Sequence, residues 1–102
     1  MSDQVLSLLN QLQTAMERAG QWQTIAPTPE KLMSTEPFSI DTLSFLEWLQ
    51  WIYIARLRAL IEAGNPLPGG AQVLPYAEES LKASAISVPG LLALIGELDK
   101  AL

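Results

Sequence analysis

The apolar residues of this chain recur at helical spacing in several separate stretches. In residues 2–20 they return every three or four positions and would line one face of a helix. These positions are Val5, Leu8, Leu9, Leu12, Met16 and Ala19. Gly20 follows them, and glycine is the usual residue in the left-handed conformation just after a helix. We therefore predict that the first helix ends at Gly20.

Residues 21–39 lose this period. Three prolines lie between positions 27 and 37, and each fixes its own backbone and disfavours helix in the residue before it. One helical turn is predicted from Thr28, with Pro29 in its first position. The apolar side chains of the segment are Trp22, Ile25, Leu32, Met33 and Phe38. We therefore expect this proline-rich loop to pack against the helices.

The second helix is predicted within residues 39–64. Asp41 or Ser44 can cap it, and Ser44 with Glu47 three residues later forms a capping box. Gly64 and the sequence NPLPGG (65–70) end it. At about 100° per residue, its main apolar face carries Phe45, Trp48, Leu49, Ile52, Ala59, Leu60 and Ala63. More than half of the circumference is apolar, so we expect neighbours on several sides.

Two further helices are predicted. The first covers residues 74–84, with Pro75 in its first turn. The second covers residues 88–102, capped by Ser87. No stretch alternates with a period of two for long enough to be a strand. The sequence therefore predicts a single domain of residues 1–102, an all-α four-helix bundle with the proline-rich loop between helices 1 and 2 packed against it.

The composition excludes several kinds of functional site. The 102 residues include no cysteine, which excludes a disulfide framework, and no histidine, the commonest general base. We expect neither a metal nor a cofactor. Net charge is −5, from 6 Lys and Arg against 11 Asp and Glu. Because nucleic-acid affinity rests on neutralising phosphates, we expect no direct binding to nucleic acid.

We expect a soluble, cytoplasmic protein. The N-terminal sequence has an acid where a signal peptide needs a basic region. The longest apolar run, residues 48–55, is far shorter than the roughly 20 residues that span a membrane. No membrane partner is expected, and the sequence leaves the oligomeric state open.

Two residues depart from the pattern of the second helix. Arg56 falls near the middle of the main apolar face, and Trp51 falls on the polar side. Arg56 either extends its charged end to solvent or to a carboxylate, or it anchors a carboxylate or phosphate of a partner. Trp51 is either covered by the proline-rich loop or exposed as an anchor for another protein, because Trp and Arg dominate interface hot spots.

The stretch STEPFSIDTLSFLEWLQWIYIARL (34–57), with PLPG (66–69) and PYAE (75–78), resembles the YqcC-like family of small proteobacterial proteins. The likeness covers nearly the whole chain and is densest at Thr35, Pro37, Phe38, Asp41, Thr42, Glu47, Trp48, Leu49, Gln50, Trp51 and Arg56. It implies a helical bundle without an established catalytic activity. Genes of the family typically neighbour the gene for tRNA pseudouridine synthase C, and that name is sometimes attached to the family. One departure is Ala55, which stands where the family usually has proline and predicts an unkinked helix.

The resemblance therefore implies a non-catalytic accessory protein that assists tRNA pseudouridine synthase C through protein–protein contact. The suspected contact residues are Phe38, Glu47, Trp48, Gln50, Trp51 and Arg56. The alternative is a small-ligand pocket under the proline-rich loop, around Trp22, Phe38, Trp48 and Arg56.

Catalysis is the disfavoured interpretation. Pseudouridine synthases use an aspartate nucleophile, and Asp41 is the aspartate that matches the family. Its place before a helix, however, predicts a cap. The other carboxylates form no convergent pair, and PGG (68–70) lacks the spacing and the lysine of a phosphate-binding loop.

Overall fold

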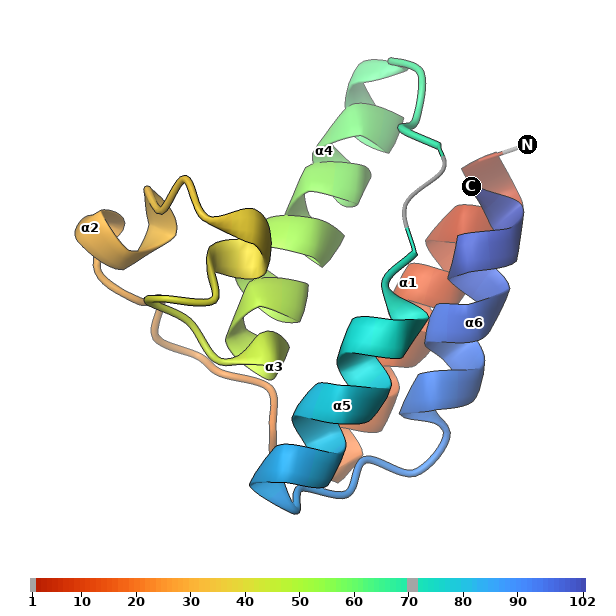
Figure 1. Cartoon of the computed structure of the whole chain (residues 1–102). Coiled ribbons are helices and arrows are strands. Elements are labelled where there is room, and N and C mark those ends of the chain that lie inside the picture. Colours follow the sequence, from red (N-terminus) through yellow and green to blue (C-terminus); the bar gives the residue numbers. More distant parts are fainter. Residues whose placement is uncertain (1, 70–71) are drawn as a thin grey trace.

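The computed structural model describes residues 2–69 and 72–102, whose regular elements are all helical (Figure 1). In chain order they are α1 (Ser2–Arg18), α2 (Pro29–Leu32), the 3-10 turn η1 (Pro37–Ser39), α3 (Phe45–Trp48), the π-helical segment η2 (Leu49–Ile54), α4 (Ala55–Ala63), α5 (Leu74–Ser84) and α6 (Leu91–Ala101). The prediction of an all-α fold is confirmed.

Several predicted helix ends are confirmed. Gly20 and Gly64 follow α1 and α4 with φ of 71° and 70°, a left-handed conformation that glycine adopts without a steric penalty. The predicted turn after Thr28 is α2, and Pro29 occupies its first position. The predicted stop at residues 65–70 reaches Gly70, which lies outside the described residues.

The last helix begins later than predicted. Residues 88–90 form a turn, and α6 starts at Leu91 rather than at position 88. Gly90 has φ of 82° and precedes the first helical residue, so its left-handed backbone sets the boundary. The predicted cap at Ser87 is therefore wrong, because Ser87 lies outside the first turn of the helix.

The elements α3, η2 and α4 form one continuous helix, residues 45–63, which we call the central helix. Its middle is π-helical, so each turn there holds more residues than an α-turn. The residues beyond it are consequently rotated from the positions that a regular wheel assigns. Ala59 and Ala63, which the pattern placed on the main apolar face, are exposed, so that face is wrong at these two positions beyond the π-helical segment. The helix continues past Ala55 as predicted, but it is not regular before it.

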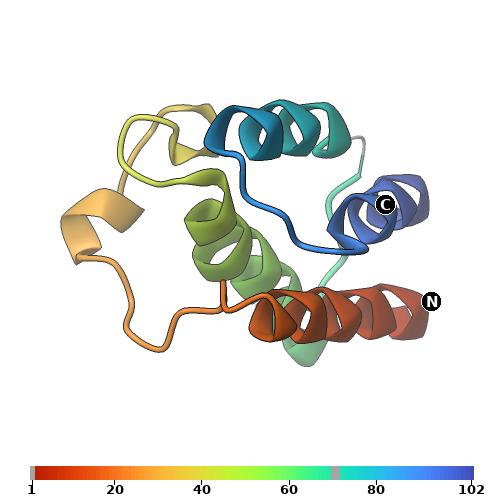
Figure 2. The same ribbon diagram turned by 90° about the horizontal axis from the view of Figure 1, so that it is seen from below.

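The long helices surround one core (Figure 2). Helix α1 packs along α6, α5 packs on α6, and the central helix contacts α1 through α4 and α5 through α3. Fully buried side chains from these elements include Leu9, Leu12, Met16, Leu49, Ile54, Leu57, Leu91, Ile95 and Leu98. The predicted four-helix bundle does not describe the whole fold, because the short helices α2 and η1 lie beside the long helices. In the described part of the chain, no helix is long and apolar enough to cross a membrane.

Asp99 links α6 to the start of α5. Its carboxylate accepts hydrogen bonds from the backbone N–H groups of Val73, at 3.0 Å, and Leu74, at 2.9 Å. The positive end of the α5 dipole is thereby capped by a residue of another helix. Burial, with a smaller effect of the Asp99 charge, raises the pKa of Tyr53 to about 12. The hydrogen bonds of Asp99 therefore join α6 to the start of α5.

Candidate functional site

Three of the suspected contact residues surround one loop residue, Gln23. Glu47, Gln50 and Trp51 project from the central helix, and each forms a hydrogen bond with Gln23, more than 20 positions earlier in the chain. We call these four residues the clamp. It fastens the segment after α1 to the central helix.

Gln50 forms two hydrogen bonds within the clamp. Its side-chain amide pairs with the Gln23 backbone, accepting from the N–H at 2.9 Å and donating to the carbonyl oxygen at 2.7 Å. Only 5% of Gln50 is exposed. Since a buried amide is costly without partners, this pairing explains how a polar residue is accommodated there.

Glu47 has a local and a long-range partner. The Ser44 N–H donates to Glu47 Oε1 at 3.0 Å, and the Glu47 N–H donates to Ser44 Oγ at 3.2 Å, which confirms the predicted capping box. Glu47 Oε2 accepts from Gln23 Nε2 at 3.3 Å. The backbone hydrogen bond from Ser44, and to a smaller extent the Gln23 amide, lower the pKa of Glu47 against the opposing effect of burial. The carboxylate therefore stays ionised at neutral pH.

Trp51 uses its polar atom within the chain. Its Nε1–H donates to Gln23 Oε1 at 2.8 Å, and the residue is half-buried. This contact agrees with the interpretation of Trp51 as a residue that the loop covers. A partner-binding role of Trp51 stays a prediction. Sequence reasoning missed Gln23, because a glutamine in an aperiodic loop gives no sign of its distant partners.

Trp48 and Phe38 belong to an aromatic cluster on another side of the same helix. The Phe38 ring lies edge-on to Trp48 at 4.9 Å and tilted against Tyr76 at 4.3 Å. Trp48 also stacks on Tyr53 at 5.1 Å, and Phe45 meets Tyr76 edge-on at 5.3 Å. Such pairs add to the stabilisation from burial. The cluster joins η1, the central helix and α5.

Arg56 lies apart from both groups. It is exposed, whereas the sequence pattern placed it in the middle of the main apolar face. The wide turn of η2 immediately before Ala55 explains the difference, because it rotates Arg56 away from the core. Within residues 2–69 and 72–102, Arg56 takes part in no ion pair. The structure therefore divides the six suspected residues among the clamp, the aromatic cluster and an exposed cation.

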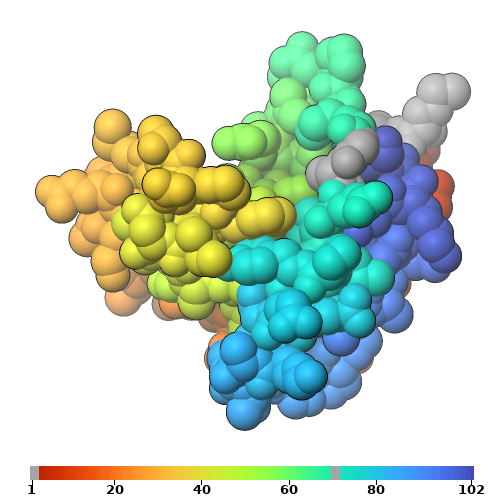
Figure 3. All heavy atoms as spheres, viewed as in Figure 1, coloured from red at the N-terminus to blue at the C-terminus, as the bar shows by residue number. Residues whose placement is uncertain are grey.

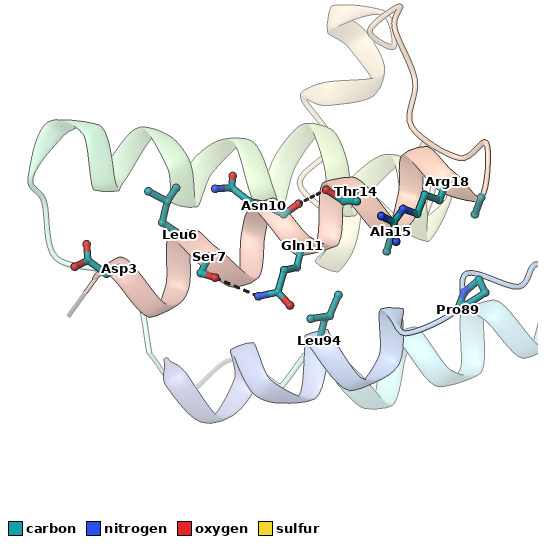
Figure 4. Close-up of a pocket in the computed structure, with 11 residues that line it drawn as sticks. Asp3, Leu6, Ser7, Asn10, Gln11, Thr14, Ala15, Arg18, Pro89 and Leu94 are labelled. Atoms are coloured by element: carbon teal, nitrogen blue, oxygen red, sulfur yellow. Dashed lines mark hydrogen bonds between the residues drawn. The ribbon is translucent and has the colours of Figure 1, made fainter.

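The predicted pocket around Trp22, Phe38, Trp48 and Arg56 stays a prediction. A cleft of about 510 Å³ does include Trp22, but its other walls come from the start of α3 and the end of α5. A wider groove of about 800 Å³ runs along α1. Figure 4 shows Leu94 of α6 pointing across this groove toward Gln11 of α1, with Pro89 near its Arg18 end.

The acidic residues of the described segments do not gather into a metal site. No group of three or more histidine, cysteine, aspartate or glutamate residues in those segments is placed to hold an ion. Asp41 accepts a hydrogen bond from the Ser34 hydroxyl, and Ser44, not Asp41, caps α3. Asp41 thus ties two parts of the loop together.

These features define a small all-helical protein whose long loop is fastened to a central helix. A sequence model of a family described as DUF446, tRNA pseudouridine synthase C, matches residues 4–101. The uncharacterized protein YqcC of Escherichia coli K12 is 37% identical over 98 residues, covering 96% of this chain and 87% of that protein. An uncharacterized protein of Haemophilus influenzae is 48% identical over 82 residues, covering 80% of this chain and 77% of that protein. The chain belongs to the YqcC-like family.

Two further comparisons concern the fold and a longer relative. The solution NMR structure of YqcC from E. coli matches with a TM-score of 0.82 at 36% identity, covering 96% of this chain and 84% of that one. A protein of Pectobacterium carotovorum named tRNA pseudouridine synthase C is 39% identical over 66 residues. The match covers 65% of this chain but only 18% of that protein, so a segment like this chain is a small part of a longer polypeptide there.

Proposed function

We propose that this chain is a non-catalytic accessory protein that binds tRNA pseudouridine synthase C and assists its modification of tRNA. The observation that carries the proposal is the Pectobacterium relative, in which 18% of a protein of that name is similar to this chain. Segments that are joined in one protein and separate in another often work in contact. The description of the family supports the same partner.

The charge of the chain favours the enzyme over the RNA as the contact. With net charge −5, the chain is repelled by phosphates. An enzyme that binds tRNA presents basic surface, and an acidic helper complements such a surface. The accessory protein therefore contacts the enzyme and makes no tRNA contact of its own.

The geometry separates the suspected contact residues by role. Glu47, Gln50 and Trp51 are bonded to Gln23, so they act on the partner through the loop that they hold. Arg56 is the one exposed side chain among the six suspected residues and is free to reach a carboxylate of the enzyme. The long helices act together as a bundle that carries the loop and Arg56. The chain works in the cytoplasm, where tRNA is modified.

An affinity experiment tests this function. The chain carries a tag and is produced together with the tRNA pseudouridine synthase C of the same genome, and another tRNA pseudouridine synthase of that genome serves as the control bait. The tagged chain should retain synthase C after nuclease treatment and leave the control enzyme in the wash. Loss of synthase C after nuclease treatment would mean that tRNA bridges the two proteins, and absence of retention throughout would overturn the proposal.

A further inference from the structure

The loop between α1 and the central helix carries the most exposed large hydrophobic side chains of the described residues. We call residues 24–43 the lobe, and Figure 3 shows it in orange and yellow, projecting from one side of the helices. Ile25, Met33 and Ile40 are 82%, 76% and 61% exposed. The next most exposed large hydrophobic residues of the described segments, Leu6 and Leu92, are 37% exposed. Large exposed apolar groups on one projection are typical of an interaction surface.

Hydrogen bonds tie residues 31–42 of the lobe together. Thr42 Oγ1 donates to the Lys31 carbonyl oxygen at 2.7 Å, which ties α2 to the chain just before α3. The Ser34 hydroxyl donates to Asp41, so the backbone next to Met33 and the backbone next to Ile40 are held near each other. A surface that is ordered before binding loses less conformational entropy when it binds.

The lobe also contains a strained turn. Phe38 and Ser39 have φ of 58° and 50°, a left-handed conformation that is unfavourable for a bulky side chain. The packing of the Phe38 ring on Trp48 and Tyr76 offsets this cost. Ile40 follows this turn directly. The turn therefore sets the direction of the exposed Ile40 side chain, which points away from the core. Packing of the core alone does not require an isoleucine there.

The charge of the lobe limits what can cover it. Its charged residues are Glu30, Lys31, Glu36 and Asp41, three acids against one base. A second copy of the chain would bring two acidic lobes together, and an anionic lipid surface or a nucleic acid would add further negative charge. A protein surface that combines apolar side chains with Lys or Arg complements both properties of the lobe.

We propose that the lobe is the surface that docks on tRNA pseudouridine synthase C, into an apolar depression bordered by Lys or Arg side chains. This inference rests on the function proposed above and adds the site and the chemistry of the contact. Ile25, Met33 and Ile40 enter the depression, and Glu30 and Glu36 face its basic border. The clamp and the aromatic cluster position the lobe without touching the enzyme.

The test measures binding by isothermal titration calorimetry, with the full chain and the purified synthase C of the same genome. The variant Ile25→Ser/Met33→Ser/Ile40→Ser should raise Kd by at least about 30-fold, the effect of losing one or more interface hot spots. The matched control Leu6→Ser/Leu92→Ser changes exposed leucines outside the lobe and should stay within about threefold of the unmodified chain. Far-UV circular dichroism checks that both variants fold.

A second variant acts on charge alone and covers the case in which the triple variant does not fold. Glu30→Lys/Glu36→Lys should also weaken binding, and the difference from the unmodified chain should shrink as salt is raised. Unchanged affinity of a folded triple variant, or of the charge variant if the triple variant unfolds, would overturn the lobe as the docking surface while the proposed function stands.

Two other results would contradict the inference. If the unmodified chain does not bind the synthase at all, the proposed function fails and the lobe assignment fails with it. If the unmodified chain self-associates in sedimentation and the triple variant does not, a second copy covers the lobe. The lobe assignment predicts instead that both proteins sediment as the same species in the absence of the synthase.

Discussion

Replacing Gln50 by alanine removes the centre of the clamp. The variant loses two hydrogen bonds to the Gln23 backbone, of 2.9 and 2.7 Å. Each contributes about 0.5–1.5 kcal/mol net, and truncating a buried side chain adds a packing cost. Because Gln23 itself is exposed, water replaces part of the loss at its backbone. We expect the free energy of unfolding to fall by about 2–3 kcal/mol, which lowers Tm by on the order of 10 °C in a domain of this size.

The assay pairs urea unfolding with amide hydrogen exchange. Gln4→Ala is the matched control, because Gln4 is an exposed glutamine on α1 and its replacement should change stability by less than about 0.5 kcal/mol. The Gln23 amide should be protected from exchange in the unmodified chain and lose most of that protection in Gln50→Ala. If Gln50→Ala unfolds at the same urea concentration as Gln4→Ala and the Gln23 amide keeps its protection, the clamp does not hold the loop.

Three further predictions concern the central helix. The Ala55 N–H donates to the Ile52 carbonyl oxygen, three residues back, and not to the carbonyl four residues back as in an α-helix. Ala55→Pro should therefore lower the free energy of unfolding by only about 1 kcal/mol, whereas Ala59→Pro, in the regular helix α4, should lower it by about 3 kcal/mol. Equal losses of the two variants in urea unfolding would contradict this. The pKa of Glu47 is lowered from 4.5 in the fold, so the ionised carboxylate stabilises the folded state above pH 4.5. This stabilisation is lost as the pH falls below 4.5 through the lowered pKa. Glu47→Gln should therefore lose less stability than the unmodified chain between about pH 7 and about pH 3, and identical losses would argue against the effect. The buried Tyr53 hydroxyl has no hydrogen-bond partner in the described part of the chain. The free energy of unfolding of Tyr53→Phe should therefore be higher than that of the unmodified chain or within about 0.5 kcal/mol of it. The substitution should also remove the titration of a phenol with a pKa of about 12. A loss above about 1 kcal/mol for Tyr53→Phe would point to a partner for that hydroxyl.

Local features of the fold were predictable from the sequence. The range of α5, the ends at Gly20 and Gly64 and the capping box at Ser44 all depend on residues within one or two helical turns. Helical periodicity and capping act over such distances, so a single sequence contains the information.

The features that sequence reasoning missed depend on distant contacts or on a choice between two local conformations. The π-helical segment η2 begins and ends within an apolar run that fits a regular helix equally well, and the burial of Gln50 requires the loop at Gln23. The start of α6 depends on Gly90 taking a left-handed conformation when Ser87 offered a competing cap. The displacement of Arg56 from the apolar face follows from the π-helical segment, so one missed turn changed the interpretation of a suspected contact residue.

The structure changes what a mutation in the family-like stretch tests. Substitutions at Glu47, Gln50 or Trp51 remove bonds to Gln23 and disturb the loop, so a loss of binding in these variants can follow from altered loop geometry. Substitutions at exposed positions of the lobe leave the clamp intact. Exposed side chains therefore separate contact from stability more cleanly than the tryptophans do.

Sedimentation velocity of an equimolar mixture of this chain and the tRNA pseudouridine synthase C of the same genome, without tRNA, tests the proposed function most directly. We predict that the chain leaves its slow boundary and sediments with the enzyme in one faster boundary. Two separate boundaries at concentrations of about 10 μM, well above the Kd of a stable complex, would contradict the account.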